Sequence, residues 1–440
     1  MSNQVYNARR SRLMATIGDD ATLIVCSGQE KIRSRDTEYR FRANSDLFYL
    51  SGFEEPEAVL VLSPGHDEGD FTLFVRPKDK KKEIWEGRRA GPEGAISSYG
   101  ADQAYPLSEL DEKLPDLLRK RETLYYQLGA DDVFDKKVLG VISSLRRVKK
   151  RAPEAPVVLR DPREHLHPMR KIKTASELEL LRKACEISAE GHLAAMKACR
   201  PGMYEYELQA LIEYTFLRKG GQFPAFTTIV GGGDNGTILH YTSNRDQLRD
   251  GDLVLIDAGC EFSYYAGDIT RTFPVSGKFT PEQRDVYQAV LDAEEAAIAM
   301  CTVGETPHDI HQATIRRLTQ SMVDIGLLKG TLDQLIEEKA YFDFFMHGTG
   351  HWLGIDVHDV GPYYDESGAL KLVSGVVQTI EPGLYIGMDA DVPEAFRGIG
   401  VRIEDDVLTT ETGPVVLTGG VPKSVEALEE VVGSGLTISL

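Results

Sequence analysis

The chain has 440 residues, which is enough for two or three domains of ordinary size. Its composition, 42% hydrophobic and 27% charged residues, is typical of a soluble globular protein. The formal net charge of −19 repels nucleic acids and anionic membranes. Two basic runs, at 80–82 and 146–151, lack interleaved aromatic side chains, so we interpret them as solvated surface.

The sequence contains no apolar signal-peptide core in its first twenty residues and nowhere 18 consecutive apolar residues. Its five cysteines are odd in number and show no C-x-x-C spacing. We therefore expect a cytoplasmic protein with reduced thiols, without a membrane span, a disulfide framework or a thiolate metal cluster.

The first 168 residues predict a small α/β domain. The runs ATLIVCSG, AVLVLSP and FTLFVRP are strand-like, whereas LSELDEKLPDLLRKR has apolar residues at helical spacing, with Pro115 interrupting it. The segment 151–174 is rich in proline and charge, and we interpret it as the link to a second domain over 169–440.

The second domain opens with a strong helix that we expect Ser176 to cap, with Glu179 completing a capping box. Another helix follows and closes on Gly220 and Gly221, and two more are expected at roughly 281–302 and 306–326. Strand-like segments that carry acidic residues lie between and after these helices. Helices and strands therefore come in separate blocks, which favours an α+β domain over a parallel Rossmann-type sheet. The alternation of helix pairs and acid-bearing strand pairs also indicates two related halves.

Five residues of the C-terminal half carry the strongest functional signal: Asp257, Asp268, His351, Glu381 and Glu404. Asp257 ends one strand-like run and Asp268 begins another, and the connection between them is rich in Gly, Tyr and Ser. We predict a hairpin that places these two carboxylates opposite each other on one face of a sheet.

Four carboxylates and one imidazole suit two hard divalent cations better than one structural zinc ion, because four positive charges then balance four negative ones. Solvent-facing charge is the ordinary explanation for acids in a strand. Here Leu253 and Leu255 share the face of Asp257, which indicates that the face is buried. A buried carboxylate needs a partner, so the leading interpretation is a two-metal hydrolase.

His347 and His351 are four residues apart, as in the zinc-binding H-E-x-x-H helix, but Gly348 occupies the position of the catalytic glutamate. Gly348 and Gly350 also make a helix unfavourable, so we expect a loop or strand that presents His351 as a ligand. His358 follows seven residues later and strengthens the prediction of a site, whereas His240 is a weaker candidate when taken alone.

The motif HGTGHWLGIDVHD, together with GDITRTFPV, IEPGLY and GIGVRIEDD, resembles the pita-bread metallopeptidases, which include methionine aminopeptidase, prolidase, aminopeptidase P and creatinase. Two N-terminal segments, TEYRFRANSDLFYLSGFEEPEAVLVL and EIWEGRRAGPEGA, resemble bacterial Xaa-Pro aminopeptidases. The resemblance implies a pita-bread domain over 169–440. It also implies a smaller creatinase-like α/β domain over 1–168, serving substrate access and oligomerisation. The implied reaction releases the N-terminal residue from peptides with proline in second position.

The resemblance also implies the ligands of a dinuclear centre, with Mn²⁺ as the expected metal. Asp257 should chelate one ion, Asp268 and Glu404 should bridge both, and His351 and Glu381 should complete the other. A hydroxide bridging the two ions would then attack the scissile carbonyl.

Further catalytic roles follow from the same resemblance. Glu381 is expected to handle the proton of the nucleophile, and His358 to stabilise the tetrahedral oxyanion. His240 is the expected proton donor to the proline nitrogen, which leaves only when protonated because it carries no hydrogen. His347 resembles a histidine on the substrate side.

Three more residues match the family pattern away from the metal ligands. Arg402 and Tyr385 match positions that brace the ligands, with Tyr385 also beside the substrate. Trp85 resembles a tryptophan that reaches the active site of a neighbouring subunit. We therefore expect a homodimer or homotetramer that binds peptides and neither nucleic acid nor membrane.

Three alternatives stay open on sequence alone. Prolidase, which takes only Xaa-Pro dipeptides, uses the same metal motifs. A non-catalytic binding protein on the same fold would have lost ligands, whereas all five are present here. Another amidohydrolase would act on a non-peptide C–N bond.

Overall fold

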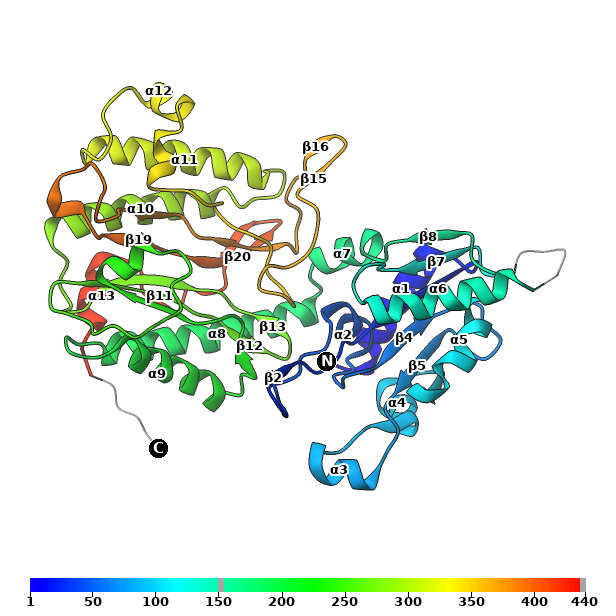
Figure 1. Ribbon diagram of the computed structural model, residues 1–440. Helices are drawn as coiled ribbons and strands as arrows, with labels where there is room; N and C mark the ends of the chain where they lie inside the picture. Colours follow the sequence, from blue (N-terminus) through cyan, green and yellow to red (C-terminus); the bar gives the residue numbers. More distant parts are fainter. Residues whose placement is uncertain (149–153, 436–440) are drawn as a thin grey trace. The chain divides into compact units, whose positions relative to one another are not determined.

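The computed structural model describes residues 1–148 and 154–435, and backbone contacts divide the chain into two compact units (Figure 1). The N-terminal unit is Met1–His167 and the C-terminal unit is Pro168–Leu440. Residues 149–151 of the second basic run and 151–153 of the expected link lie outside the described residues.

A six-stranded mixed sheet forms the core of the N-terminal unit, in the order β6-β5-β4-β1-β7-β8. The pairs β5–β6, β1–β7 and β7–β8 are parallel, and β1–β4 and β4–β5 are antiparallel. The sheet strands are β1 (Ala21–Cys26), β4 (Val59–Leu62), β5 (Phe71–Val75), β6 (Gln103–Pro106), β7 (Thr123–Tyr126) and β8 (Val158–Arg160), and a separate hairpin holds β2 (Ile32–Ser34) and β3 (Thr37–Glu38). The expected strands at β1, β4 and β5 are confirmed.

The helices of this unit are α1 (Asn3–Ile17), α2 (Ser45–Ser51), α3 (Lys80–Glu86), α4 (Gly91–Tyr99), η1 (Leu107–Glu109), α5 (Leu110–Leu118) and α6 (Asp132–Arg146). The prediction that Pro115 interrupts a helix is wrong, since α5 continues through it. Leu110, Leu114 and Leu118 bury one face of α5 against the sheet, and this packing outweighs the backbone hydrogen bond that proline cannot make.

The expected linking segment is largely structured. Its strand β8 pairs in parallel with β7, and its helix α7 (Arg163–Lys171) follows directly. Proline at 156 and 162 flanks the strand instead of disrupting it, as is tolerated at a sheet edge.

Two helix pairs flank most strands of the C-terminal unit, α8 with α9 on one side and α10 with α11 on the other, whereas β15 and β16 project away from them (Figure 1). Its helices are α8 (Ala175–Ala198), α9 (Glu205–Arg218), η2 (Gly233–Thr237), α10 (Pro281–Ala299), α11 (Pro307–Asp324), α12 (Leu332–Glu337), η3 (Ala340–Asp343), η4 (Glu394–Phe396) and α13 (Val425–Val431). The expected α+β class is confirmed.

The strands of this unit form small antiparallel sheets, β10-β11-β14, β13-β12-β9, β17-β20-β21, β18-β19 and β15-β16. Their bounds are β9 (Phe223–Pro224), β10 (Ile229–Gly232), β11 (Leu253–Asp257), β12 (Cys260–Phe262), β13 (Tyr265–Ala266), β14 (Thr270–Pro274), β15 (Tyr364–Asp365), β16 (Gly368–Ala369), β17 (Val377–Ile380), β18 (Gly383–Tyr385), β19 (Gly400–Arg402), β20 (Asp405–Thr410) and β21 (Gly413–Val416). One large apolar cluster joins both helix pairs to strands that lie between them, including β11, β14 and β19, whereas the β15-β16 hairpin is largely exposed.

The start of α8 differs from the prediction that Ser176 caps it. The N-cap is Thr174, whose backbone N–H donates to Glu177 Oε2 at 2.9 Å. Both T-x-x-E and S-x-x-E fit the local sequence. Glu177 prevails because it is buried and its Oε1 accepts a hydrogen bond from the Tyr265 hydroxyl at 3.0 Å.

None of the described helices combines the length and the apolar character that a bilayer crossing requires. The five cysteines all lie in the described ranges, where each is a free thiol.

Candidate metal centre

A cavity of about 530 Å³ in the C-terminal unit brings together residues from four separate motifs. Its lining includes Asp257, Asp268, His351, Glu381 and Glu404, which are the five expected ligands, together with His240, His347, His358 and Arg402. The apolar part of the lining consists of Phe226, Ile229, Leu239 and Val357.

The expected pairing of Asp257 with Asp268 is wrong in register. Asp257 is the last residue of β11 and lies opposite Thr270, whereas Asp268 lies in the loop before β14. The intervening chain forms its own strands in another sheet. Gly259 approaches Gly267 so closely that a Cβ at Gly259 would lie 1.7 Å from the Gly267 carbonyl oxygen. The two carboxylates therefore share one cavity without being cross-strand neighbours.

Glu381 and Glu404 occupy equivalent positions at strand ends. Glu381 follows the last residue of β17, and Glu404 lies between β19 and β20. The main chain of Glu404 donates to the Thr270 carbonyl at 3.1 Å, and the Thr270 hydroxyl donates to Glu404 Oε2 at 2.6 Å. These two contacts join the halves of the unit directly at the site.

His351 lies on an extended segment that runs alongside β17, as expected for a loop or strand. Its carbonyl accepts a hydrogen bond from the Thr379 N–H at 2.9 Å. A Cβ at Gly350 would lie 1.8 Å from the Thr379 carbonyl oxygen, so this approach requires glycine. His351 Nδ1 donates to the Trp352 carbonyl at 3.1 Å, which leaves Nε2 as the unprotonated nitrogen.

The unprotonated His351 Nε2 points at the carboxylates, 3.6 Å from Asp268 Oδ2 and 3.5 Å from Glu381 Oε1. Burial lowers the pKa of His351 to about 4, so the ring is neutral, as a metal ligand must be. One ligand atom each from Asp268, His351 and Glu404 lies within 4.8 Å of the others. This separation suits a cation held between them.

The electrostatics of the carboxylates also fit bound cations. Burial raises the pKa of Glu381 to about 7. Burial, reinforced by neighbouring carboxylates, holds the pKa values of Asp268 and Glu404 well above the usual range. The Oδ1 atoms of Asp257 and Asp268 are buried and have no hydrogen-bond partner among the described residues. A cation in the cavity would lower the pKa values of these carboxyl groups so that they ionise, and it would coordinate the unpaired oxygens.

Arg402 contacts an expected ligand directly, and Tyr385 contacts Arg402. Arg402 Nη2 donates to Asp257 Oδ2 at 2.6 Å, and its Nη1 donates to the Tyr385 hydroxyl at 3.0 Å. His347 Nδ1 lies 2.8 Å from the Gly348 carbonyl, which requires this nitrogen to carry the proton. The Tyr385 hydroxyl therefore donates to His347 Nε2 at 2.8 Å, and both ring nitrogens of His347 are engaged.

The remaining predicted residues have different positions. The ring of His358 packs against the ring of His351, with 4.2 Å between the centroids. His240 lies three residues after the end of η2; it is exposed and lines the cavity. Trp85 belongs to α3 of the N-terminal unit, where its side chain is 88% exposed.

The family model for metallopeptidase family M24 matches residues 179–411, which span every residue that lines the cavity. The chain belongs to metallopeptidase family M24. The model for the aminopeptidase P N-terminal domain matches residues 6–125, so both units of this M24 protein have a counterpart.

Relatives of this M24 protein are similar over nearly the whole chain. It is 45% identical over 430 residues to the Xaa-Pro aminopeptidase of Escherichia coli K12, covering 98% of this chain and 97% of the relative. The Xaa-Pro aminopeptidase of Haemophilus influenzae is 43% identical over 432 residues, with the same coverage of both chains.

Solved structures agree with this result. Pseudomonas aeruginosa aminopeptidase PepP has a TM-score of 0.96 at 45% identity, covering 98% of each chain. An E. coli aminopeptidase P variant in complex with substrate has a TM-score of 0.95 at 44% identity and the same coverage.

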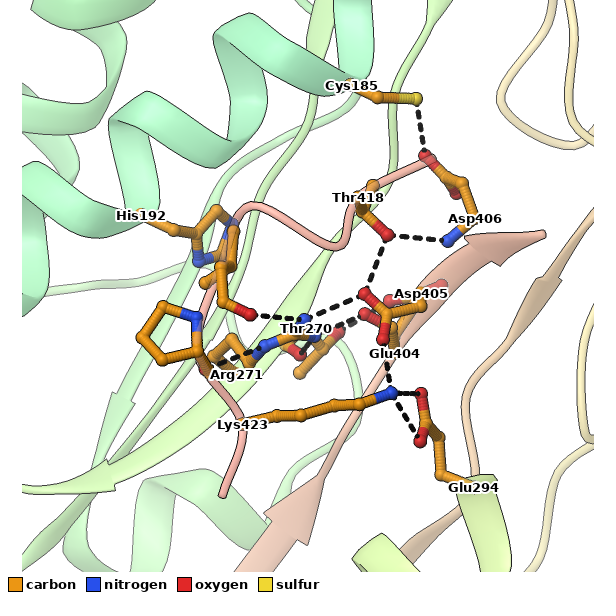
Figure 2. A network of polar contacts seen from close by, with 12 residues as sticks. Cys185, His192, Thr270, Arg271, Glu294, Glu404, Asp405, Asp406, Thr418 and Lys423 are labelled. Atoms are coloured by element: carbon orange, nitrogen blue, oxygen red, sulfur yellow. Dashed lines mark hydrogen bonds and ion pairs between the residues drawn. The ribbon is translucent and has the colours of Figure 1, made fainter. Parts of the chain in front are cut away.

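Sequence reasoning missed several residues that contact the segments carrying the expected ligands of this M24 protein. Thr270, Arg271, Asp405 and Asp406 are all fully buried and contact ligand-bearing segments (Figure 2). The available signal was the run Glu-Asp-Asp at 404–406, since three successive acids in a β-strand cannot all face solvent.

Proposed function

We propose that this protein is an Xaa-Pro aminopeptidase, which hydrolyses the bond between an N-terminal residue and a following proline. The observation that carries the proposal is the convergence of four carboxylates and His351 on one cavity. The similarity of both units to Xaa-Pro aminopeptidases supports the substrate class.

The residues present fit a dinuclear metal centre. Asp257, Asp268, His351, Glu381 and Glu404 would hold two divalent cations, with Asp268 and Glu404 shared between them. The oxygen-rich donor set favours a hard ion, and we propose Mn²⁺. Bound cations would polarise the scissile carbonyl and lower the pKa of water.

Three side chains of the cavity act on the peptide and on the attacking water in this proposal. Glu381 takes up a proton from the water, a role open to a carboxylate that lines the cavity. His358 donates a hydrogen bond to the carbonyl oxygen as negative charge develops on it. His240 donates a proton to the proline nitrogen as the C–N bond breaks.

Arg402, Tyr385 and His347 form a hydrogen-bonded chain that begins at Asp257. Arg402 holds Asp257 in one orientation through its 2.6 Å contact, and its second contact orients Tyr385. His347 lines the cavity, and because both of its ring nitrogens are engaged, the ring braces Tyr385. Tyr385 thus connects Arg402 to the substrate side of the cavity.

The unit boundaries suggest separate tasks. Residues 169–440 would carry catalysis, and residues 1–168 would serve substrate access and oligomerisation. Trp85 would reach the active site of a neighbouring subunit, because an indole that is 88% exposed favours burial against a partner. We propose a cytoplasmic homodimer or homotetramer.

The deciding experiment compares two substrates of the Mn²⁺-reconstituted enzyme, an Xaa-Pro-Xaa tripeptide and the matching Xaa-Pro dipeptide. Faster hydrolysis of the tripeptide, suppressed by a chelator, is expected. Hydrolysis of the dipeptide alone would indicate a prolidase and contradict the proposed substrate. Mn²⁺ binding without hydrolysis of either peptide would indicate a non-catalytic protein or a non-peptide substrate.

A further inference from the structure

Two acidic residues directly after Glu404 have no part in the proposed chemistry. Asp405 and Asp406 begin β20, and both are 0% exposed. Successive residues of a strand point to opposite faces, so the two carboxylates extend in different directions (Figure 2). A buried carboxylate is costly unless its partners compensate it, and each of these has a distinct set.

Asp406 reaches the loop that carries Asp268. Its Oδ2 accepts a hydrogen bond from the Asp268 backbone N–H at 2.9 Å. The same oxygen lies 3.2 Å from Cys185 Sγ of α8, which donates to it. Asp406 therefore holds the main chain of Asp268 against β20, the strand that directly follows Glu404. Asp268 and Glu404 are the two proposed bridging ligands.

Asp405 reaches the opposite way, into a buried ion network. Its Oδ1 accepts from Arg271 Nη2 at 2.7 Å and from the Thr418 hydroxyl at 2.6 Å, and its Oδ2 accepts from Lys423 Nζ at 2.7 Å. Lys423 also donates to both carboxylate oxygens of Glu294, each at 2.8 Å. Two cations thus face two anions, and the network is balanced.

Arg271 transmits this anchoring to the other bridging ligand. Its Nη1 donates to the Glu404 carbonyl at 2.6 Å and to the Thr270 carbonyl at 3.0 Å. Its Nε and Nη2 donate to the carbonyls of Pro422 and Val421, so the guanidinium has one fixed orientation. Asp405 therefore fixes the Arg271 guanidinium, and this guanidinium connects the Glu404 main chain to β14.

We infer that Asp405 and Asp406 are positioning residues that set the spacing between the carboxylates of Asp268 and Glu404. The inference rests on the proposed function, in which these two carboxylates bridge the metal ions. Asp406 holds the Asp268 main chain directly, and Asp405 holds the Glu404 main chain through Arg271. Thr418 links the two, since it donates to Asp405 and accepts from the Asp406 N–H at 3.0 Å.

The competing explanation is that the two aspartates only stabilise the fold. Buried ion pairs contribute little net stability and are often replaceable by apolar residues, although removal of a single partner is destabilising. Metal affinity separates the two explanations, because an altered carboxylate spacing weakens metal binding in a protein that still folds.

The test measures Mn²⁺ dissociation constants of the metal-free full-length protein by titration calorimetry, alongside its thermal unfolding and its kcat and KM for the tripeptide. Asp406→Ala removes the acceptor for the Asp268 N–H, whereas Asp406→Asn retains one. Asp406→Ala is expected to weaken Mn²⁺ binding by about 10- to 100-fold and to lower kcat more than it changes KM. Asp406→Asn should recover to within about threefold of the wild type, since a neutral acceptor restores most of one hydrogen bond.

A second variant and a matched control distinguish a specific effect on metal binding from a general loss of stability. Thr418→Val keeps the side-chain shape but removes the hydroxyl and both of its hydrogen bonds, and it should weaken Mn²⁺ binding by about threefold to tenfold. Glu154→Ala removes a buried acid of the N-terminal unit that accepts from Arg119 Nη1 at 2.9 Å. It should lower the unfolding temperature and leave Mn²⁺ affinity unchanged.

Wild-type Mn²⁺ affinity in Asp406→Ala or in Thr418→Val would overturn the inference. So would an Asp406→Asn variant as weak as Asp406→Ala, because the hydrogen bond to Asp268 would then not be the cause. Failure of the wild type itself to bind Mn²⁺ or to cleave the tripeptide would instead overturn the proposed function.

Discussion

Hydrogen bonds to neighbouring groups fix the orientation of two of the proposed ligand residues. The Trp352 carbonyl determines which nitrogen of His351 carries the proton, and Arg402 determines which oxygen of Asp257 faces inward. Such contacts remove rotational freedom from a ligand before a metal ion arrives, and this lowers the entropy lost on binding.

The bridging assignment of Glu404 leads to a first prediction. Glu404→Gln preserves the size of the side chain but removes its charge. We expect kcat/KM to fall by about a thousandfold or more, equivalent to roughly 4 kcal/mol of transition-state stabilisation. Metal analysis of the same sample should show fewer than two Mn²⁺ per chain. Glu411→Gln, on the exposed turn between β20 and β21, is the control and should match the wild type. Substantial turnover by the Glu404 variant would remove Glu404 from the metal centre.

His358 leads to a second prediction, on the rate of the chemical step. His358→Ala should lower kcat by about a hundredfold with little change in KM, because a donor to the developing oxyanion acts mainly in the transition state. His308→Ala, a histidine exposed outside the cavity, provides the control. An unchanged kcat would exclude His358 from the mechanism.

At the scale of elements, the proposed carboxylate ligands lie at or near the ends of strands. Asp257 ends β11, Glu381 follows β17, and Glu404 lies between β19 and β20. Strand ends allow a carboxylate to leave the packed layers while its neighbours stay buried. The helix pairs cover the outer faces of these strands and exclude water from the far side of the site.

A buried histidine of α8 leads to a third prediction, on stability and pH. His192 on α8 is fully buried and its Nε2 donates to the Ala258 carbonyl at 3.0 Å. Burial lowers its pKa to about 4 from an ordinary value of 6.5. Above pH 6.5 the residue is neutral in both states. Between pH 6.5 and 4 only the unfolded chain takes up the proton, so stability falls as the pH falls, by on the order of 3 kcal/mol in total.

His192→Gln isolates this contribution. Its amide can still donate to the Ala258 carbonyl, but it does not titrate. Urea unfolding of the metal-free protein between pH 7 and 4 should show a smaller loss of stability in the variant than in the wild type. Equal pH dependence in both proteins would contradict the assignment of a neutral buried imidazole.

At the scale of the whole molecule, the two units differ in what metal binding does to them. All five proposed ligands belong to the C-terminal unit, and the N-terminal unit has its own sheet and apolar core. Metal binding therefore stabilises one unit directly, by an amount that grows with the ratio of metal concentration to dissociation constant.

Removal of metal leads to a fourth prediction. At 100 times the dissociation constant, Mn²⁺ should add about 2.7 kcal/mol of stability, and a chelator should lower the unfolding temperature accordingly. Hydrogen exchange should accelerate around 257–272, 347–359 and 377–406, where the ligand-bearing segments lie. Exchange in β1, β4 and β5 should not change. A uniform loss of protection across both units would contradict the localisation of the metal.

Much of this protein follows from local sequence. Alternating and continuous apolar runs predicted β1, β4 and β5, and glycines around His351 correctly excluded a helix there. The five expected metal ligands could be selected from the sequence because each lies in a short motif of neighbouring residues and has a side chain suited to binding a cation.

Other features depended on contacts between residues far apart in the chain, and tertiary structure decided them. Asp257 lies opposite Thr270, and not Asp268, because the intervening chain folds into a separate sheet. Thr174 caps α8 because Tyr265, 88 residues from Glu177, holds the glutamate of the capping box. Asp406 holds the Asp268 main chain from 138 residues away. Sequence determines which groups are available for chemistry, whereas hydrogen bonds across such separations exist only once the chain has packed, and they decide where those groups point.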